Sequence, residues 1–307
     1  MVRDAVIDGL TISGFSDEIS ADFDEQLRTV TGLGMNHICL RAADGKGIAN
    51  YSLAEAESGL LPRLRANGVR VSSLGSPIGK IDVTDDAKFE RQLSQLETLC
   101  RMCDLFDCRF IRVFSFYVPT DRPADDFSGA VIAKLRRFVE IAQRHDVVLI
   151  HENEKGIFGD TAARCRLLFD ELGSDHFKAA FDFANFVQCG EDPEQCWSLL
   201  KDQVVYFHVK DAVAATEANV VCGTGDGRIA DILADAVSGG YRGFLTLEPH
   251  LVNFASFATL ERNAEASSGG PAGQPVPLDG PGAYATQFHA LTAMLDELSP
   301  SRTTLVQ

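Results

Sequence analysis

Four acidic or imidazole side chains each follow a short apolar, β-prone run in the second half of the chain. They are Glu152, Asp182, His208 and Glu248. The intervals between them resemble the length of a strand, a loop, a helix and a return loop, which together take about 30 residues. A residue at the carboxyl end of each strand would lie on the face of a parallel barrel where active sites are built. We therefore expect these four side chains to meet and hold a divalent metal ion.

Three carboxylates and one imidazole make a mainly oxygen site, which hard or borderline divalent cations prefer. Such an ion would polarise a carbonyl group and stabilise an enediolate. Glu152 and Glu248 come from different strands, so we expect them to face each other and act as the catalytic bases, one removing a proton and the other returning it. Return to the opposite face gives epimerisation, return to the neighbouring carbon gives isomerisation, and loss of a β leaving group gives elimination. These residues do not separate the three outcomes.

Four further side chains are candidates for substrate binding. Asn185 follows the second expected ligand by three residues. Lys210 lies two residues beyond the third ligand, where it would bind a substrate oxygen or phosphate, or simply pair with Asp211. His250 lies two residues beyond the fourth ligand and would contact substrate or be an ordinary loop histidine. Arg112 lies in an expected strand, and the sequence does not decide whether it points into the barrel or out of it.

Three other features have plain structural explanations beside the functional ones. His151 precedes a ligand position, so in an extended strand it points to the opposite face, and we expect a structural or supporting role. Gly225-Asp226-Gly227 precedes an expected helix and would offer backbone N–H groups to an anion, although a tight turn explains it equally well. Cys100 and Cys103 lie in an apolar helical pattern, which favours buried cysteines over a zinc site.

The elements that must position these side chains alternate between strand and helix eight times. The expected strands are 10–14, 37–40, 69–74, 109–114, 147–150, one ending at 182, one ending at 208, and 243–247. The expected helices are about 22–32, 52–67, 85–106, 130–145, 160–172, a short one from 193, 229–237 and 283–298. Such alternation predicts an α/β protein with a parallel sheet, and eight units predict a closed (β/α)₈ TIM barrel.

A doubly wound open sheet is the competing fold. It would gather its ligand at one switch point, whereas four candidate ligands on successive strands fit a ring better. No linker separates the eight units, so we expect a single domain over residues 1–307. A stretch rich in Gly, Pro and Ser at about 261–282 is expected to be an insertion on the active-site face.

Composition narrows the class of protein further. The 307 residues carry a formal net charge of −16, which argues against nucleic-acid binding. No apolar run approaches the roughly 18 residues of a membrane span, and no secretory signal is visible, so we expect no membrane association and a cytoplasmic location. Eight cysteines without such a signal do not predict a disulfide framework.

With these motifs in hand, the whole chain resembles the xylose-isomerase-like TIM barrel superfamily, in particular its sugar phosphate isomerase/epimerase group. The motifs are His151-Glu152-Asn153, Phe181-Asp182-Phe183-Ala184-Asn185, His208-Val209-Lys210-Asp211 and Leu247-Glu248-Pro249-His250. In the ketose 3-epimerases of that group the four matching side chains hold one divalent metal. The resemblance implies Mn²⁺ as the expected ion, with Mg²⁺, Co²⁺ or Zn²⁺ as alternatives. Asn185 departs from the pattern, because many ketose epimerases have a substrate-contacting histidine there.

The resemblance implies a metal-dependent sugar isomerase or epimerase of carbohydrate metabolism, acting on a keto-sugar or related polyol. The alternative is a metal-dependent lyase, either an inosose-type dehydratase or an enzyme that eliminates from a 3-oxo-glycoside or C-glycoside. An endonuclease IV-like nuclease fits less well, because that family needs a His-rich site with several metals and this chain has 7 His. The expected partner is a small sugar; whether the chain forms a homo-oligomer or joins a partner subunit is left open.

Overall fold

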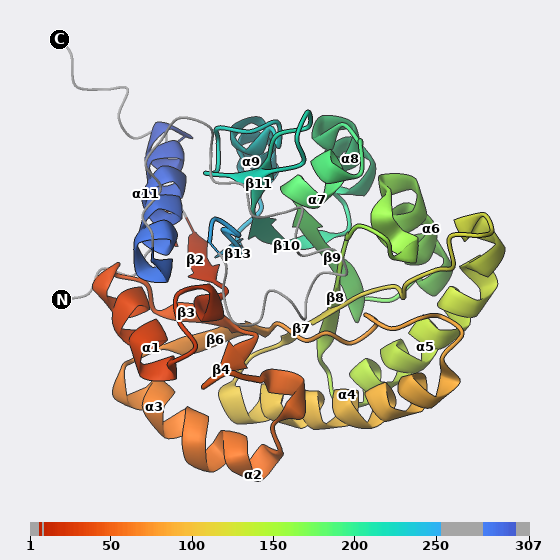
Figure 1. Ribbon diagram of the computed structural model, residues 1–307, viewed down its shortest axis with the longest axis horizontal. Coiled ribbons are helices and arrows are strands. Elements are labelled where there is room, and N and C mark those ends of the chain that lie inside the picture. Colours follow the sequence, from red (N-terminus) through yellow and green to blue (C-terminus); the bar gives the residue numbers. More distant parts are fainter. Residues whose placement is uncertain (1–5, 8, 253–278, 299–307) are drawn as a thin grey trace.

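The computed structural model describes residues 6–7, 9–252 and 279–298. Within these residues, eight parallel strands form an inner ring that helices surround (Figure 1). The eight strands are β2 (Leu10–Gly14), β3 (His37–Leu40), β6 (Arg70–Leu74), β7 (Phe110–Val113), β8 (Val148–Glu152), β9 (Phe177–Asp182), β10 (Val204–Val209) and β13 (Phe244–Leu247). The smaller strands are β1 (Val6–Ile7), β4 (Ala42–Ala43), β5 (Lys46–Gly47), β11 (Asp211–Ala212) and β12 (Asn219–Val220).

The helices follow the strands in the order that a β/α barrel requires. They are α1 (Phe23–Gly32), α2 (Leu53–Glu55), α3 (Leu61–Ala66), α4 (Asp86–Phe106), α5 (Ser128–Arg144), α6 (Ala162–Leu172), α7 (Phe183–Gln188), α8 (Pro193–Leu200), α9 (Ile229–Ser238) and α11 (Gly280–Leu298). Several of these helices follow a residue whose side chain caps the first helical turn. The side chain of Asp22 accepts the N–H of Glu25 at the start of α1, and Thr161 accepts that of Arg164 at the start of α6.

The pairing of the strands confirms the predicted barrel and rejects the open sheet. Hydrogen-bonded neighbours run in the order β2, β13, β10, β9, β8, β7, β6, β3, all parallel, while β1 adds an antiparallel edge to β2. The ring closes between β2 and β3, where Phe15 and Cys39 form an isolated parallel bridge. We call this β2–β3 junction the seam. The protein is therefore a single, nearly closed TIM barrel.

The boundaries differ from the sequence-based ones at two places that matter for the site. A short helix, α7, begins directly after Asp182, where the sequence indicated only the end of a strand. Its first residue, Phe183, and the next aromatic residue, Phe186, are both buried, so their apolar character continues the strand-like run and hides the helix start. The predicted helix at 52–67 is instead α2 and α3 joined by a π-helical turn, which ends just before Pro62. Proline lacks an N–H donor, so a regular ladder of hydrogen bonds cannot pass through it.

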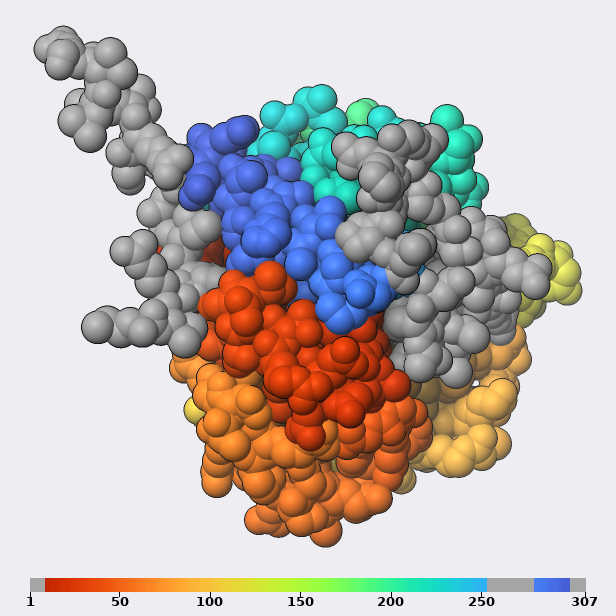
Figure 2. Space-filling model, turned by 60° about the vertical axis from the view of Figure 1, so that its left-hand side comes forward, coloured from red at the N-terminus to blue at the C-terminus, as the bar shows by residue number. Residues whose placement is uncertain are grey.

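The last helix, α11, lies beside β2 and α1 in Figure 1, and its blue atoms adjoin the red N-terminal part of the chain in Figure 2. Gly14 at the end of β2 has no room for a Cβ, because the hydroxyl of Tyr284 from α11 occupies that position. The helix begins at Gly280, three residues before the predicted start. Most of the predicted insertion at 261–282 falls outside the described residues.

The cysteines behave as small buried apolar residues. Cys100 and Cys103 are fully buried on α4, as the helical pattern predicted, and all eight cysteines are free thiols. Among the described helices, none is long and apolar enough to cross a membrane.

Candidate metal centre and active site

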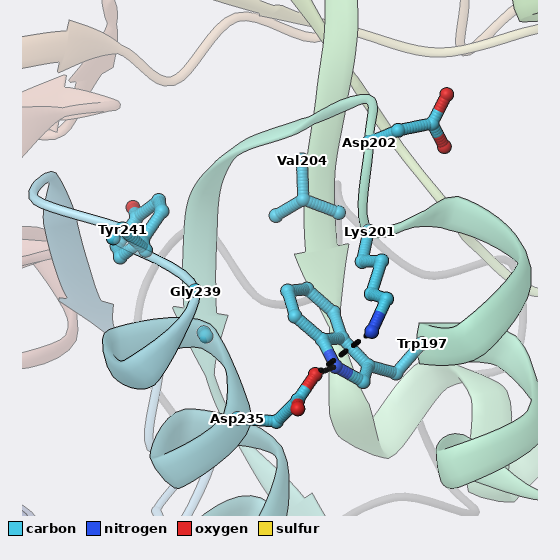
Figure 3. A pocket seen from close by; sticks show the side chains of 9 residues that line it. Trp197, Lys201, Asp202, Val204, Asp235, Gly239 and Tyr241 are labelled. Atoms are coloured by element: carbon cyan, nitrogen blue, oxygen red, sulfur yellow. Dashed lines mark hydrogen bonds and ion pairs between the residues drawn. The ribbon is translucent and has the colours of Figure 1, made fainter.

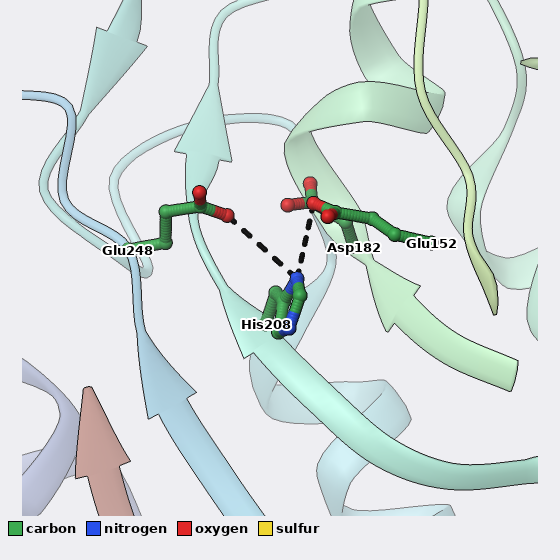
Figure 4. A group of neighbouring side chains, drawn as sticks. All are labelled: Glu152, Asp182, His208 and Glu248. Carbon is green, nitrogen blue, oxygen red and sulfur yellow. Dashed lines mark ion pairs between the residues drawn. The ribbon is translucent and has the colours of Figure 1, made fainter. Parts of the chain in front are cut away.

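The four expected ligands meet at the carboxyl ends of neighbouring strands (Figure 4). Glu152 and Asp182 are the last residues of β8 and β9, His208 is the penultimate residue of β10, and Glu248 directly follows β13. All four side chains are buried, and one ligand atom from each lies within 4.8 Å of the others. The register of the strands explains this meeting, because His208 pairs with Asp182 across β9 and β10.

Both glutamates are held by arginines through one carboxylate oxygen. Arg41 Nη1 donates to Glu248 Oε1 at 2.9 Å, and Arg112 Nη1 donates to Glu152 Oε2 at 3.1 Å. The other oxygens face the imidazole: Glu152 Oε1 lies 3.0 Å and Glu248 Oε2 lies 3.7 Å from Nδ1 of His208. Each glutamate therefore has one anchored oxygen and one that points toward the common centre.

The aspartate is fixed in a similar way by the start of α7. Its Oδ1 accepts the N–H of Asn185, so Asp182 acts as the N-cap of that helix. Asn153 supports the same turn, since its amide donates to the Asp182 carbonyl and its Oδ1 accepts the Asp182 N–H. Oδ2 of Asp182 is left for the centre, 3.2 Å from Nζ of Lys210.

The side chains fit a divalent cation by two independent observations. Within the described part of the chain, Asp182 Oδ2, Glu248 Oε2 and both ring nitrogens of His208 make no hydrogen bond, although they are buried. Buried polar atoms without a hydrogen bond are costly, and metal coordination would satisfy them.

The second observation is the charge of the surrounding network. Ion pairs connect three buried cations to five buried carboxyl groups, a formal excess of two negative charges when all five are ionised and the histidines are neutral. The cations are Arg41, Arg112 and Lys210, and the carboxylates belong to Asp17, Glu18, Glu152, Asp182 and Glu248. Such an excess is unfavourable in a buried site, and one divalent cation would neutralise it.

The ionisation of the carboxyl groups reflects the same imbalance. Burial raises the pKa of Glu18 to about 8 in spite of Arg41, and it raises that of Asp182 well above its usual range. Burial also acts on Glu152, but His208 and Arg112 outweigh it and lower this pKa to about 2.

The pKa of Glu248 likewise falls well below its usual range, because Lys210, His250 and nearby cations outweigh burial. Glu152 and Glu248 are therefore ionised, as a ligand or a base must be. The same cations limit how strongly either carboxylate binds a proton.

The four candidate substrate-binding residues all lie at this centre. Arg112 points into the barrel, which answers the question that the sequence left open, and within the described residues its Nη2 makes no hydrogen bond. Asn185 turns its amide to the Asn153 carbonyl at 2.8 Å and to Glu152 Oε1 at 3.5 Å. His250 is buried, with Nε2 3.5 Å from Glu248 Oε1.

Lys210 does not pair with Asp211, contrary to one of the two expectations for it. The carboxylate of Asp211 instead accepts backbone N–H groups from Gly223, Gly225 and Gly227 at 2.8–3.0 Å. The glycine-rich turn at 225–227 thus binds an anion, but that anion is the chain's own carboxylate. A Cβ at Gly225 would lie 2.5 Å from Asp211 Oδ1, so the turn leaves no room there for a phosphate.

Sequence reasoning missed the residues on the first two strands. Arg41 follows β3, and its guanidinium contacts Asp17 at 2.9 Å and Glu18 at 3.2 Å as well as Glu248. Its Cζ lies 4.4 Å from the centroid of the Phe15 ring. These residues come directly after their strands, so the rule that located the four ligands would also have found them.

A second group of side chains has the types that bind cations, but a protein cation already serves it. Glu18, Glu248 and His250 offer ligand atoms within 4.8 Å of one another. The guanidinium of Arg41 donates to both of these carboxylates. The arginine therefore takes the place that a second metal ion would need.

His151 lies on the outer side of the barrel, as the alternation of the strand predicted. Its ring packs against Phe177 and Phe169, at centroid distances of 5.7 and 6.1 Å. Burial lowers its pKa to about 4. It has the surroundings of a neutral core residue.

A cleft of about 390 Å³ lies at the opposite end of the strands (Figure 3). It is bounded by the ends of α8 and α9 and by Val204, the first residue of β10. Asp235 ties its walls together, accepting hydrogen bonds from Trp197 Nε1 at 2.7 Å and from Lys201 Nζ at 3.1 Å. Because the expected ligands are at the other end of β10, this cleft is not part of the candidate site.

The family of the chain follows from a comparison of its sequence with family models. Residues 31–268 match the model of the xylose isomerase-like TIM barrel, so the chain belongs to that family. No curated protein has a sequence that matches it significantly.

Solved structures of the same fold include enzymes of two reaction types. L-ribulose 3-epimerase is 19% identical, with a TM-score of 0.70 over 94% of this chain and 95% of that one. The probable 3-DHS dehydratase AsbF from Bacillus anthracis is 16% identical, with a TM-score of 0.67 over 92% and 98%. The IolI protein, solved with a zinc atom, is 11% identical, with a TM-score of 0.71 over 94% and 99%. At these identities the likeness establishes the fold alone.

Proposed function

We propose that the protein is a divalent-metal-dependent sugar isomerase or epimerase that acts on a keto-sugar or related polyol. The observation that carries the proposal is the buried centre of Glu152, Asp182, His208 and Glu248, which lies in an ion-pair network with a formal excess of two negative charges. Mn²⁺ is the proposed ion, because the ligands are mainly carboxylate oxygens with one imidazole. IolI, a fold neighbour with zinc, supports a metal in a site of this architecture.

The chain's own residues divide the work of proton transfer. A bound divalent ion supplies Lewis-acid stabilisation of negative charge on substrate oxygens. Glu152 and Glu248 approach the centre from different strands, so one takes the proton from carbon and the other returns it. Arg112 and Lys210 present N–H groups that orient substrate oxygens, and Asn185 holds Glu152 in place.

A lyase is the second candidate, and one feature of the site favours it. Elimination needs an acid for the leaving group in addition to a base for the proton. Lys210 and His250 both lie within 4 Å of Glu248, so a proton donor stands beside the proposed base. AsbF, a fold neighbour described as a probable dehydratase, agrees with this alternative.

Incubation with candidate keto-sugars in deuterated water distinguishes the two reactions. The protein is loaded with Mn²⁺, and products are followed by NMR and mass spectrometry. An epimer or isomer that carries deuterium at the reacting carbon supports the proposal. Loss of water or of an aglycone without any epimer rejects it in favour of the lyase. Near-wild-type turnover in a chelator-treated sample rejects metal dependence altogether.

A further inference from the structure

Lys210 places a buried positive charge directly on the oxygens that face the candidate metal. Its Nζ lies 3.2 Å from Asp182 Oδ2 and 3.8 Å from Glu248 Oε2. These are the two carboxylate oxygens of the centre that make no hydrogen bond within the described residues. The lysine side chain is itself buried, so water does not screen its charge.

The two arginines of the network are placed differently. Arg41 binds Glu248 through Oε1 and Arg112 binds Glu152 through Oε2, which are the anchored oxygens that point away from His208. An arginine in this position holds a ligand in its orientation without contacting the ligating atom. Lys210 instead contacts the ligating atoms, and its flexible four-carbon stem allows the ammonium to move.

We propose that Lys210 competes with the metal ion for Asp182 and Glu248. When no metal is bound, the ammonium keeps these two carboxylates together and lowers the charge of the buried centre. When the metal binds, the ammonium gives up its contact with both oxygens and moves toward the space where substrate oxygens lie. The lysine therefore sets the metal affinity of the site. This inference rests on the proposed metal centre.

The balance of charge gives the sign and the size of the effect. With Lys210 present, three carboxylate ligands, one ammonium and one divalent ion sum to zero, so the bound state is tolerated in a buried site. Without the ammonium, the ion meets a more negative centre, and the cations that remain, Arg41 and Arg112, contact the anchored oxygens. Repulsion between a single and a double charge about 5 Å apart, even at the dielectric of water, corresponds to at least about a tenfold change in affinity.

The experiment measures the Kd for Mn²⁺ in the wild-type protein and in Lys210→Met, which keeps the apolar stem and removes the charge. Free Mn²⁺ is counted from its EPR signal during a titration. We expect Lys210→Met to bind Mn²⁺ about tenfold more tightly or better, and Lys210→Arg to bind no more tightly than the wild type. Lys80→Met is the matched control: it removes another largely buried lysine, which pairs with Glu154 at 2.8 Å and not with a ligand. Its Kd should stay close to that of the wild type.

Equal or weaker binding by Lys210→Met, with Lys80→Met unchanged, overturns the inference, because Lys210 would then support the metal rather than compete with it. Thermal unfolding in chelator and in saturating Mn²⁺ shows whether the variant is folded. Lys210→Met should be less stable than the wild type in chelator and should gain more from saturating Mn²⁺. If the variant does not fold without metal, Lys210→Gln refolded with Mn²⁺ and then titrated against a chelator gives the same comparison. If the wild type itself binds no Mn²⁺, the proposed function fails and not merely the role of Lys210.

Discussion

Replacement of Arg41 by methionine should destabilise the barrel far more than the loss of a partly exposed arginine that forms two ion pairs. The Arg41 side chain is 3% exposed and contacts three carboxylates, those of Asp17, Glu18 and Glu248, at 2.9–3.2 Å. Breaking a buried ion pair from one side leaves charges without compensation and costs about 3–5 kcal/mol. Arg63 is the control: it contacts two carboxylates, those of Asp24 and Asp44, but its side chain is 28% exposed. Such partly exposed pairs contribute about 0–1 kcal/mol.

The assay is urea unfolding of the metal-free protein, followed by circular dichroism. Arg41→Met should lower the free energy of unfolding by about 3–5 kcal/mol, and Arg63→Met by less than about 1 kcal/mol. The double variant Arg41→Met/Asp17→Asn should recover part of the loss, because it removes one of the carboxylates that the first substitution leaves unpaired. Similar losses for the two single variants would refute the reasoning, since burial would then not govern the energy of the network.

Three further predictions concern the same region. Glu248→Gln should leave the barrel folded, abolish turnover and weaken Mn²⁺ binding; turnover near that of the wild type would contradict its role as ligand and base. The pKa of Glu18 is raised from 4.5 to about 8, so the stability this group contributes is complete below pH 4.5 and is lost as the pH rises to about 8. In chelator, thermal unfolding between pH 6 and 9 should therefore show the wild type losing stability relative to Glu18→Gln, and a difference that does not change with pH would contradict this. Asp211→Asn should lower the free energy of unfolding by about 1–3 kcal/mol, because an amide has only one oxygen to accept the N–H groups of residues 223–227. Urea unfolding measures this loss, and a free energy of unfolding equal to that of the wild type would contradict it.

The strands that carry the ligands could be predicted because the apolar runs and the polar residues that end them recur at the same interval in this sequence. Apolar β-prone runs recur at the length of a β/α unit, and each run in the second half ends in a polar residue. In a parallel barrel, the carboxyl ends of all strands lie on one face, whatever the length or conformation of the loops between them. That argument needs no knowledge of side-chain conformation, which is why it located Glu152, Asp182, His208 and Glu248.

The contacts around the ligands could not be predicted in the same way. Whether Arg112 points into the barrel depends on which alternate residues of β7 face inward. Both faces of β7 carry apolar residues, so the sequence does not reveal this. The position of Lys210 depends on the turn after β10, and that turn is set by Asp211 and the distant glycines at 223, 225 and 227. The strand-end positions of Arg41 and Glu248 follow the same rule as the ligands, but their contact joins residues more than 200 positions apart, so no local pattern indicates the contact itself.

The seam between β2 and β3 gives this charge network a second consequence. The other neighbouring strands of the ring share ladders of two or more residue pairs, whereas the described part of β2 meets β3 only through the bridge of Phe15 and Cys39. Asp17 and Glu18 lie on one side of the seam and Arg41 on the other, so their ion pairs join the two edges where backbone bonds are few. Closure of the barrel and the electrostatic state of its active end are therefore coupled. Loss of charge at Arg41, Asp17 or Glu18 would therefore weaken the contact between β2 and β3 as well as change the charge at the active end.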